Sequence, residues 1–317
     1  MCIRDRARDA DTIYEVPLLM YKEKLDETVL KKLKLDYSDE PELAAWRDFI
    51  ARSKTPLYET RIGLVGKYNE IPDPYKSIYE AFIHAGAENE CKVRVIPINS
   101  EHLIDKEVTE EKLQKLDGIL VAPGFGERGI QGKLKAIKYV RENNIPFFGI
   151  CLGMQCAAVE FANNVLGLDE AASTEVNPDT PAPIIHMMED QKTIKKKGGT
   201  MRLGAYACEI LQSTKAFAAY NSTSISERHR HRFEFNNFYL DKMEDAGMKA
   251  VGKNLENNLV EIIELENHPW FVGVQFHPEL KSTVENPHPL FVNFVKACLD
   301  NKKKPTDEAV KKAVTNF

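Results

Sequence analysis

The chain has 317 residues and a mass of 36.0 kDa, of which 43% of residues are hydrophobic and 29% charged. This composition is that of an ordinary soluble globular protein and excludes a largely disordered chain. The formal net charge of −5 implies no general affinity for nucleic acid or for anionic membranes. No membrane-spanning segment is predicted, because the longest apolar stretch, 145–159, is interrupted by proline and glycine. No secretory signal is predicted either, because the amino terminus is charged and no apolar h-region follows it. The six cysteines include no CxxC pair, so we expect reduced thiols in a cytoplasmic protein.

The first part of the chain, residues 1–53, is charged and favours helices. Its apolar residues include a set with the spacing of one helix face: Leu25, Val29, Leu30 and Leu33. Residues 54–60 contain a proline and are predicted to form a linker.

Residues 61–300 have the alternating pattern of an α/β domain. Short apolar runs predict strands at 61–66, 92–98, 118–121 and 145–150. Apolar residues at helical spacing predict helices around 78–85 and 134–140. Strands alternating with helices predict a doubly wound, mostly parallel sheet whose ligands bind outside the carboxyl ends of the strands.

A second, β-rich stretch is expected later in the same domain. Its predicted strands are 205–210, 232–235, 259–265 and 271–276. A helix at 289–299 is predicted to close the domain, and 301–317 are predicted to be a solvated, charged tail.

Cys151 is the sharpest candidate for a nucleophile. It lies between Gly149 and Gly153, directly after a predicted strand and directly before a predicted helix. This pattern is typical of a nucleophile elbow, where a strained backbone at a tight turn needs small neighbours and the helix dipole favours a thiolate. By itself, the pattern fits a buried cysteine in a glycine-containing loop equally well.

His277 and Glu279 supply the second half of a catalytic arrangement. They follow the last predicted strand, and positions two apart in an extended chain project to the same side. Glu279 can therefore contact one nitrogen of His277 while the other nitrogen faces a nucleophile. A lone histidine before a proline would be read as a loop residue. Together with the elbow, Cys151, His277 and Glu279 predict a catalytic triad.

A glycine-containing loop at 121–126 is the third candidate element. It could supply a backbone N–H to a developing oxyanion, together with the N–H of Leu152. Because Pro123 has no N–H, the donor in the loop would be Gly124. A glycine-dependent turn explains this loop equally well in isolation, and no phosphate-binding P-loop motif occurs in the chain.

The elbow, the loop and the His-Pro-Glu sequence, in this order, resemble those of the triad-type (class I) glutamine amidotransferases, which implies a flavodoxin-like fold. Further stretches make about residues 9–300 similar to the glutaminase domain of the CTP synthase family. These stretches are 66–68, 73–81, 199–204 and 227–232.

The resemblance implies a role for each candidate residue. Cys151 would be the nucleophile, with His277 and Glu279 completing the triad. Glu175 would hold the α-ammonium of glutamine and Arg232 would make a further contact, which suits a zwitterionic substrate. The residues that the resemblance assigns to glutamine binding are Gly124, Leu152, Gly153, Met154, Gln155, Glu175 and Arg232.

The resemblance also implies partners outside this domain. CTP synthases carry an amino-terminal synthetase domain that uses ATP, Mg²⁺ and UTP, and GTP activates them allosterically. Arg202 would lie in the loop linked to GTP activation. We expect residues 1–53 to be the end of a synthetase domain, with 1–6 outside the family pattern, and the chain to be a truncated glutaminase half. It would carry no cofactor or metal of its own, and the full-length protein would be a homo-oligomer, a tetramer.

Two other functions fit part of the pattern. A stand-alone glutaminase or cysteine hydrolase would need no synthetase domain and would not respond to GTP. A non-catalytic regulatory module would keep the fold without the chemistry. The Arg-His-Arg-His-Arg run at 228–232 argues against the first function, and the intact triad argues against the second.

Overall fold

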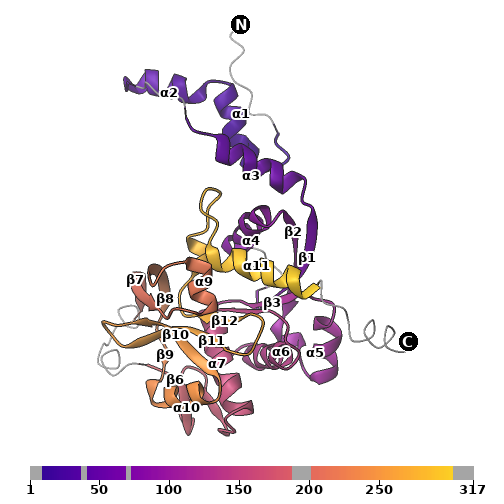
Figure 1. Ribbon diagram of the computed structural model, residues 1–317, viewed down its shortest axis with the longest axis vertical. Coiled ribbons are helices and arrows are strands. Elements are labelled where there is room, and N and C mark those ends of the chain that lie inside the picture. The colour runs from indigo at the N-terminus through magenta and orange to yellow at the C-terminus, as the bar shows by residue number, and fades with distance from the viewer. Residues whose placement is uncertain (1–8, 37–40, 69–72, 188–200, 303–317) are drawn as a thin grey trace, which may run out of the picture.

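The computed structural model describes residues 9–36, 41–68, 73–187 and 201–302, and it confirms the predicted α/β architecture (Figure 1). A nine-stranded sheet has the order β2-β1-β3-β4-β12-β11-β10-β7-β8. The first five strands in this order run parallel, and they are β2 (Cys91–Asn99), β1 (Tyr58–Gly66), β3 (Gly118–Val121), β4 (Phe147–Ile150) and β12 (Phe271–Val274).

The other strands extend the sheet in the antiparallel sense. They are β11 (Leu259–Leu265), β10 (Met248–Asn254), β7 (Arg202–Ile210) and β8 (Ser224–His231). A separate three-stranded sheet is formed by β5 (Ala171–Ser173), β6 (Ala182–His186) and β9 (Glu234–Phe235). The predicted β-rich stretch therefore splits between the central sheet and this small one.

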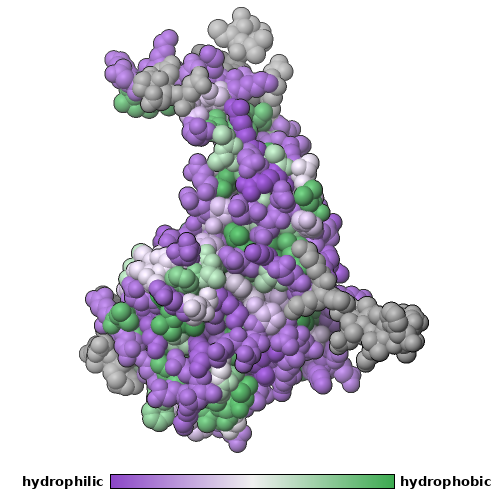
Figure 2. All heavy atoms as spheres, viewed as in Figure 1, coloured by the Kyte–Doolittle hydropathy of each residue, from purple (hydrophilic) through white to green (hydrophobic). Residues whose placement is uncertain are grey.

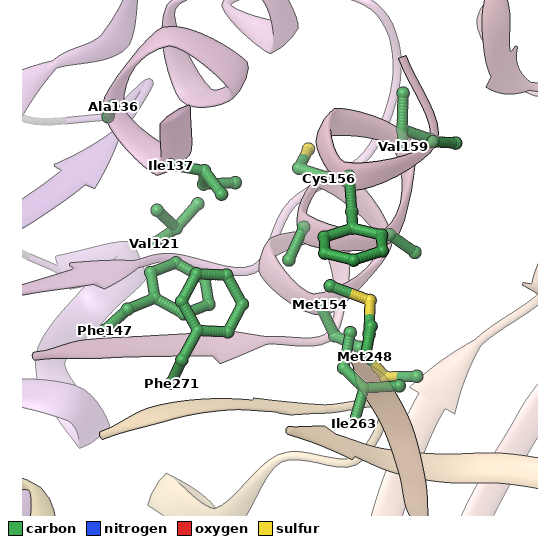
Figure 3. Close-up of a cluster of buried hydrophobic side chains, with 14 of the residues drawn as sticks. Val121, Ala136, Ile137, Phe147, Met154, Cys156, Val159, Met248, Ile263 and Phe271 are labelled. Carbon is green, nitrogen blue, oxygen red and sulfur yellow. The ribbon is translucent and has the colours of Figure 1, made fainter. Parts of the chain in front are cut away.

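Helices cover both faces of the parallel strands (Figure 1). On one face lie α4 (Lys76–Glu88) and α11 (Pro289–Lys302), where the ring of Phe291 packs edge-on against Phe82 and Phe148. On the other face lie α6 (Ile130–Glu142) and α7 (Leu152–Asn164), over the stacked rings of Phe147 and Phe271, 4.3 Å apart (Figure 3). The remaining α-helices among the described residues of the domain are α5 (Lys106–Leu113), α9 (Lys215–Tyr220) and α10 (Leu240–Asp245). Burial of apolar residues on both faces accounts for the near-continuous hydrophobic strands.

Three helices precede the domain and project from it (Figure 1). They are α1 (Val16–Lys22), α2 (Leu25–Leu33) and α3 (Ala44–Lys54). A small cluster of Tyr14, Phe49, Ile50 and Ala87 packs α3 and the turn before α1 against α4. The indole nitrogen of Trp46 donates to the carbonyl of Tyr14 at 2.7 Å, which fixes the first turn against α3.

Several predicted boundaries differ from the structure. The predicted linker 54–60 is shorter, because α3 includes Lys54 and β1 begins at Tyr58. The predicted tail begins too early, because α11 continues to Lys302. The predicted strand 232–235 is wrong in its first half, because the chain leaves the central sheet after His231 and turns before joining the small sheet as β9.

None of the helices in the described ranges is long and apolar enough to cross a membrane.

Candidate active site

Cys151 lies at a strained turn between β4 and α7, as the elbow pattern predicts. Its φ of 52° and ψ of −104° are in a region that costs a residue with a side chain about 1–3 kcal/mol. The backbone N–H of Cys151 donates to the carbonyl of Val274 at 2.7 Å, which holds the turn against the end of β12. A Cβ atom on Gly153 would lie 2.2 Å from the carbonyl oxygen of Val121, so this neighbour must be glycine.

The triad residues come from the carboxyl ends of adjacent parallel strands. Val274 of β12 pairs with Ile150 of β4, so the segments that follow these strands emerge side by side. One of them begins with Cys151 and the other carries His277 and Glu279. The Nδ1 atom of His277 lies 2.8 Å from Oε1 of Glu279, which leaves Nε2 as the nitrogen available to Cys151.

The environment of His277 favours its protonated form. Burial lowers the pKa of this imidazole, but the adjacent Cys151 sulfur and the Glu279 carboxylate outweigh burial and raise the pKa to about 10. His277 can therefore hold a proton taken from the thiol and give it up later to a leaving group.

We expect the imidazole of His277 to titrate near pH 10, and to titrate at lower pH in the Cys151→Ala variant. Burial lowers the pKa of His277, and the Cys151 sulfur is the largest influence that raises it. Removing the sulfur leaves only Glu279 to raise this pKa. Nuclear magnetic resonance of labelled histidine checks this. Since the proton is lost as pH rises through the pKa, glutamine hydrolysis should also fall above about pH 10. A titration near 6.5 in both proteins would contradict this account.

The predicted oxyanion loop lies directly against the elbow. A Cβ atom on Gly124 would lie 3.5 Å from Leu152 and 3.3 Å from Lys67. Leu152 is the first residue of α7, so no carbonyl within the helix accepts its N–H. The Lys67 ammonium donates to the carbonyl of Phe125 and so anchors the loop from its other side. Gly124 of the loop thus lies next to Leu152, the first residue of the elbow helix.

Lys133 of α6 is a second anchor of this loop, and the sequence does not reveal it. Its side chain is fully buried, and its ammonium donates to the carbonyl of Ala122 at 2.7 Å. Burial lowers the pKa of Lys133 to about 8. The hydrogen bond that holds the loop therefore requires a charged ammonium to be buried in the core, which is unfavourable.

Replacing Lys133 with methionine is expected to raise the free energy of unfolding at pH 7 by about 1–3 kcal/mol, because the variant buries no charge. The gain should shrink as pH rises from about 8 toward 10.5, since the folded wild-type protein then holds fewer protons than the unfolded one and gains stability. Urea unfolding of the wild type and the variant, at pH 7 and again near pH 10, measures the difference in the free energy of unfolding. A variant that is less stable at pH 7 would contradict it.

The structure shows what the side chains of three of the residues predicted to bind glutamine contact. The side chain of Met154 points into the core (Figure 3), so only its backbone can face the site. The side chain of Gln155 donates to the carbonyl of Phe233 at 2.9 Å and so ties the half-buried turn at Arg232 to the elbow helix. Glu175 accepts from the N–H of Gly126 at 2.9 Å, which places its carboxylate against the oxyanion loop.

A cavity of about 300 Å³ opens beside the triad. Its lining combines the loop, the family stretch at 73–81 and two of the triad residues, without Cys151. It comprises Tyr68, Pro74, Tyr75, Ser77, Ile78, Pro123, Gly124, Phe125, Arg230, His277, Glu279 and Leu280. Tyr75 also accepts a hydrogen bond from the N–H of Lys67 at 3.1 Å. The stretch at 73–81 therefore forms a wall of the cavity. Through Tyr75 it also positions Lys67, which bonds to the loop at Phe125.

Arg202 lies apart from this cavity, in a buried cluster of charges. Its guanidinium is 2.9 Å from Glu261 and 3.3 Å from Glu234, and it covers the ring of Tyr206. The guanidinium is thus occupied within the protein. The part of the predicted GTP-linked stretch at 199–200 lies outside the described residues.

Three comparisons with known proteins agree with this geometry. The family model "Glutamine amidotransferase class-I" matches residues 70–297. The chain is 63% identical to a CTP synthase of Cytophaga hutchinsonii and 60% identical to one of Flavobacterium johnsoniae, over 93% of its length in each case. It covers 54% and 55% of those relatives, so it spans about half of their length.

Among solved structures, the chain is similar to a Trypanosoma brucei CTPS glutaminase domain with bound acivicin. The identity is 34%, the TM-score is 0.71, and the match covers 76% of this chain and 94% of that one. These findings confirm the resemblance drawn from the sequence. The chain belongs to the class I glutamine amidotransferases, in the branch formed by the glutaminase domains of CTP synthases.

Proposed function

We propose that this chain hydrolyses L-glutamine through a thioester on Cys151 and provides the ammonia. The observation that carries the proposal is the convergence of Cys151, at its strained turn, with the His277–Glu279 pair from the neighbouring strand end. Glutamine binding by Glu175, Arg232 and the backbone around Gly124 is part of the same proposal. Glu175 accepts from the loop at Gly126, Gly124 lies against Leu152, and Gln155 of the elbow helix bonds to the residue after Arg232.

The first half of the reaction forms the thioester. His277 takes the thiol proton, and the Cys151 sulfur attacks the carboxamide carbon of glutamine. The oxygen becomes an oxyanion held by the N–H groups of Gly124 and Leu152, each of which lowers the barrier by about 3 kcal/mol. His277 then protonates the departing nitrogen as the C–N bond breaks, which releases ammonia and leaves a glutamyl thioester.

The second half restores the enzyme. A water molecule enters where ammonia left and gives a proton to His277 as its oxygen attacks the thioester carbon. The C–S bond breaks, glutamate is released, and the sulfur recovers its starting state. Glu279 keeps the imidazole in one orientation throughout.

In the complete protein, we propose that the ammonia aminates UTP to CTP. ATP and Mg²⁺ would act in the synthetase domain, outside the residues described above. The exposed apolar residues of α1 and α2 support a partner domain at this end of the chain, where apolar patches interrupt a hydrophilic surface (Figure 2). They are Met20, Leu25, Val29 and Leu33. A homotetramer and a cytoplasmic location belong to the same proposal.

GTP is proposed as the allosteric activator of the complete protein. The test measures glutamate release by the full-length enzyme with and without GTP, at saturating glutamine. We expect GTP to raise the rate when the synthetase domain is present. Equal rates would contradict the proposal and favour a stand-alone glutaminase.

A further inference from the structure

Gln275 is a buried side chain that the reaction described above does not use. It has no exposed surface and lies two residues before His277, where the central sheet meets the elbow. Its backbone N–H donates to the carbonyl of Glu261 at 2.9 Å, which fixes its position beside β11. Its side-chain nitrogen Nε2 lies 3.6 Å from the sulfur of Cys151 and donates a hydrogen bond to it.

The orientation of this amide follows from the groups around it. The carbonyl of Phe233 can only accept, so the Gln155 atom that contacts it at 2.9 Å must be the nitrogen Nε2. That same nitrogen lies 3.1 Å from the Gln275 side chain, which must therefore present its oxygen there. The nitrogen of Gln275 is consequently directed at the sulfur. The Gln155 amide thus donates both to the backbone carbonyl of Phe233 and to Gln275, and Gln275 in turn donates to Cys151.

We propose that Gln275 is a further catalytic residue, whose amide N–H holds the Cys151 sulfur and stabilises it as an anion before attack on glutamine. This inference rests on the proposed function for its substrate, but the hydrogen bond itself concerns the sulfur alone. Hydrogen bonds to an ionised acceptor are about twice as strong as those to a neutral one, so the amide favours the thiolate over the thiol. Gln155 is the positioning residue that keeps this amide from rotating.

The test is the rate at which iodoacetamide alkylates Cys151 in the full-length protein as pH varies, with the modified peptide identified by mass spectrometry. In Gln275→Met the side chain keeps its length but has no donor. We expect its pH profile to move to higher pH by about one unit, with about tenfold slower alkylation on the acid side. An unchanged profile would overturn the proposal.

Two further variants separate this role from a structural one. Gln275→Glu keeps an acceptor for Gln155 but places an oxygen at the sulfur, so its profile should move at least as far as that of Gln275→Met. A profile like that of the wild type in this variant would show that only packing matters and would refute the proposal. Asn254→Leu removes another buried amide, which bonds to Ala207 away from the site, and should leave the profile unchanged.

The same assay distinguishes this inference from the proposed function. Alkylation reports on the sulfur whether or not glutamine is the substrate. A shifted profile in a protein that fails to hydrolyse glutamine would support the role of Gln275 and reject the proposed reaction. A wild-type protein that hydrolyses glutamine, together with an unshifted profile in Gln275→Met, would support the proposed reaction and reject the role of Gln275.

Discussion

Replacing Cys151 with alanine is expected to lower glutamine hydrolysis by a factor of at least about 10⁴. The other described cysteines are buried, and burial raises the pKa of each of their thiols: Cys91, Cys156, Cys208 and Cys298. Burial raises the pKa of Cys156, one turn further along α7, to about 11, so its thiol stays protonated and weakly nucleophilic at neutral pH. Release of glutamate from glutamine, measured on full-length protein, gives the rate.

Cys156→Ala is the matched control for this experiment. It removes a buried thiol from the helix that follows Cys151 and should keep the rate of hydrolysis within a few-fold of that of the wild type. A Cys151→Ala protein with substantial hydrolysis, or a Cys156→Ala protein with none, would contradict the assignment of the nucleophile.

Replacing Arg202 with methionine is expected to lower the free energy of unfolding by about 3–5 kcal/mol. The guanidinium forms ion pairs with both Glu234 and Glu261, whose side chains are almost wholly inaccessible to solvent. Burial already raises the pKa of Glu261 to about 7, against the opposing charge of Arg202. Without Arg202, one buried carboxylate must lose its charge or open the strands to water. Urea unfolding at pH 8 measures the loss.

The double variant Arg202→Met/Glu261→Gln tests the cause of this loss. It removes one of the carboxylates left without a cation, so it should recover part of the lost stability. If the single variant were as stable as the wild type but lost its response to GTP, Arg202 would be a ligand contact and not a structural cation.

The parallel half of the fold could be predicted because its signals are local. Each strand from β1 to β4 contains a short apolar run, and the helices α4 and α6 each have an apolar face. β10 could not be predicted, because Lys249 and Lys253 interrupt its apolar residues and Gly252 lies at a bulge opposite Ile262. Pairing with β7 and β11 makes this segment a strand, and such pairing is not visible in the segment itself.

The site could be predicted to the same extent. Cys151, His277 and Glu279 lie in short motifs whose residue spacing predicts how their side chains are placed. The roles of Lys133 and Gln275 depend on contacts with residues far away along the chain, at Ala122 and Cys151. A buried lysine and a glutamine at a strand end carry no spacing signal, so only the folded structure shows that they support the loop and the nucleophile.

The most direct test of the central claim uses an electrophilic analogue of glutamine with the full-length protein, followed by peptide mass spectrometry. We expect a single modified cysteine, Cys151, and much slower modification in His277→Ala, because the thiol then lacks its proton acceptor. Modification of a different cysteine, or an equal rate without His277, would contradict it.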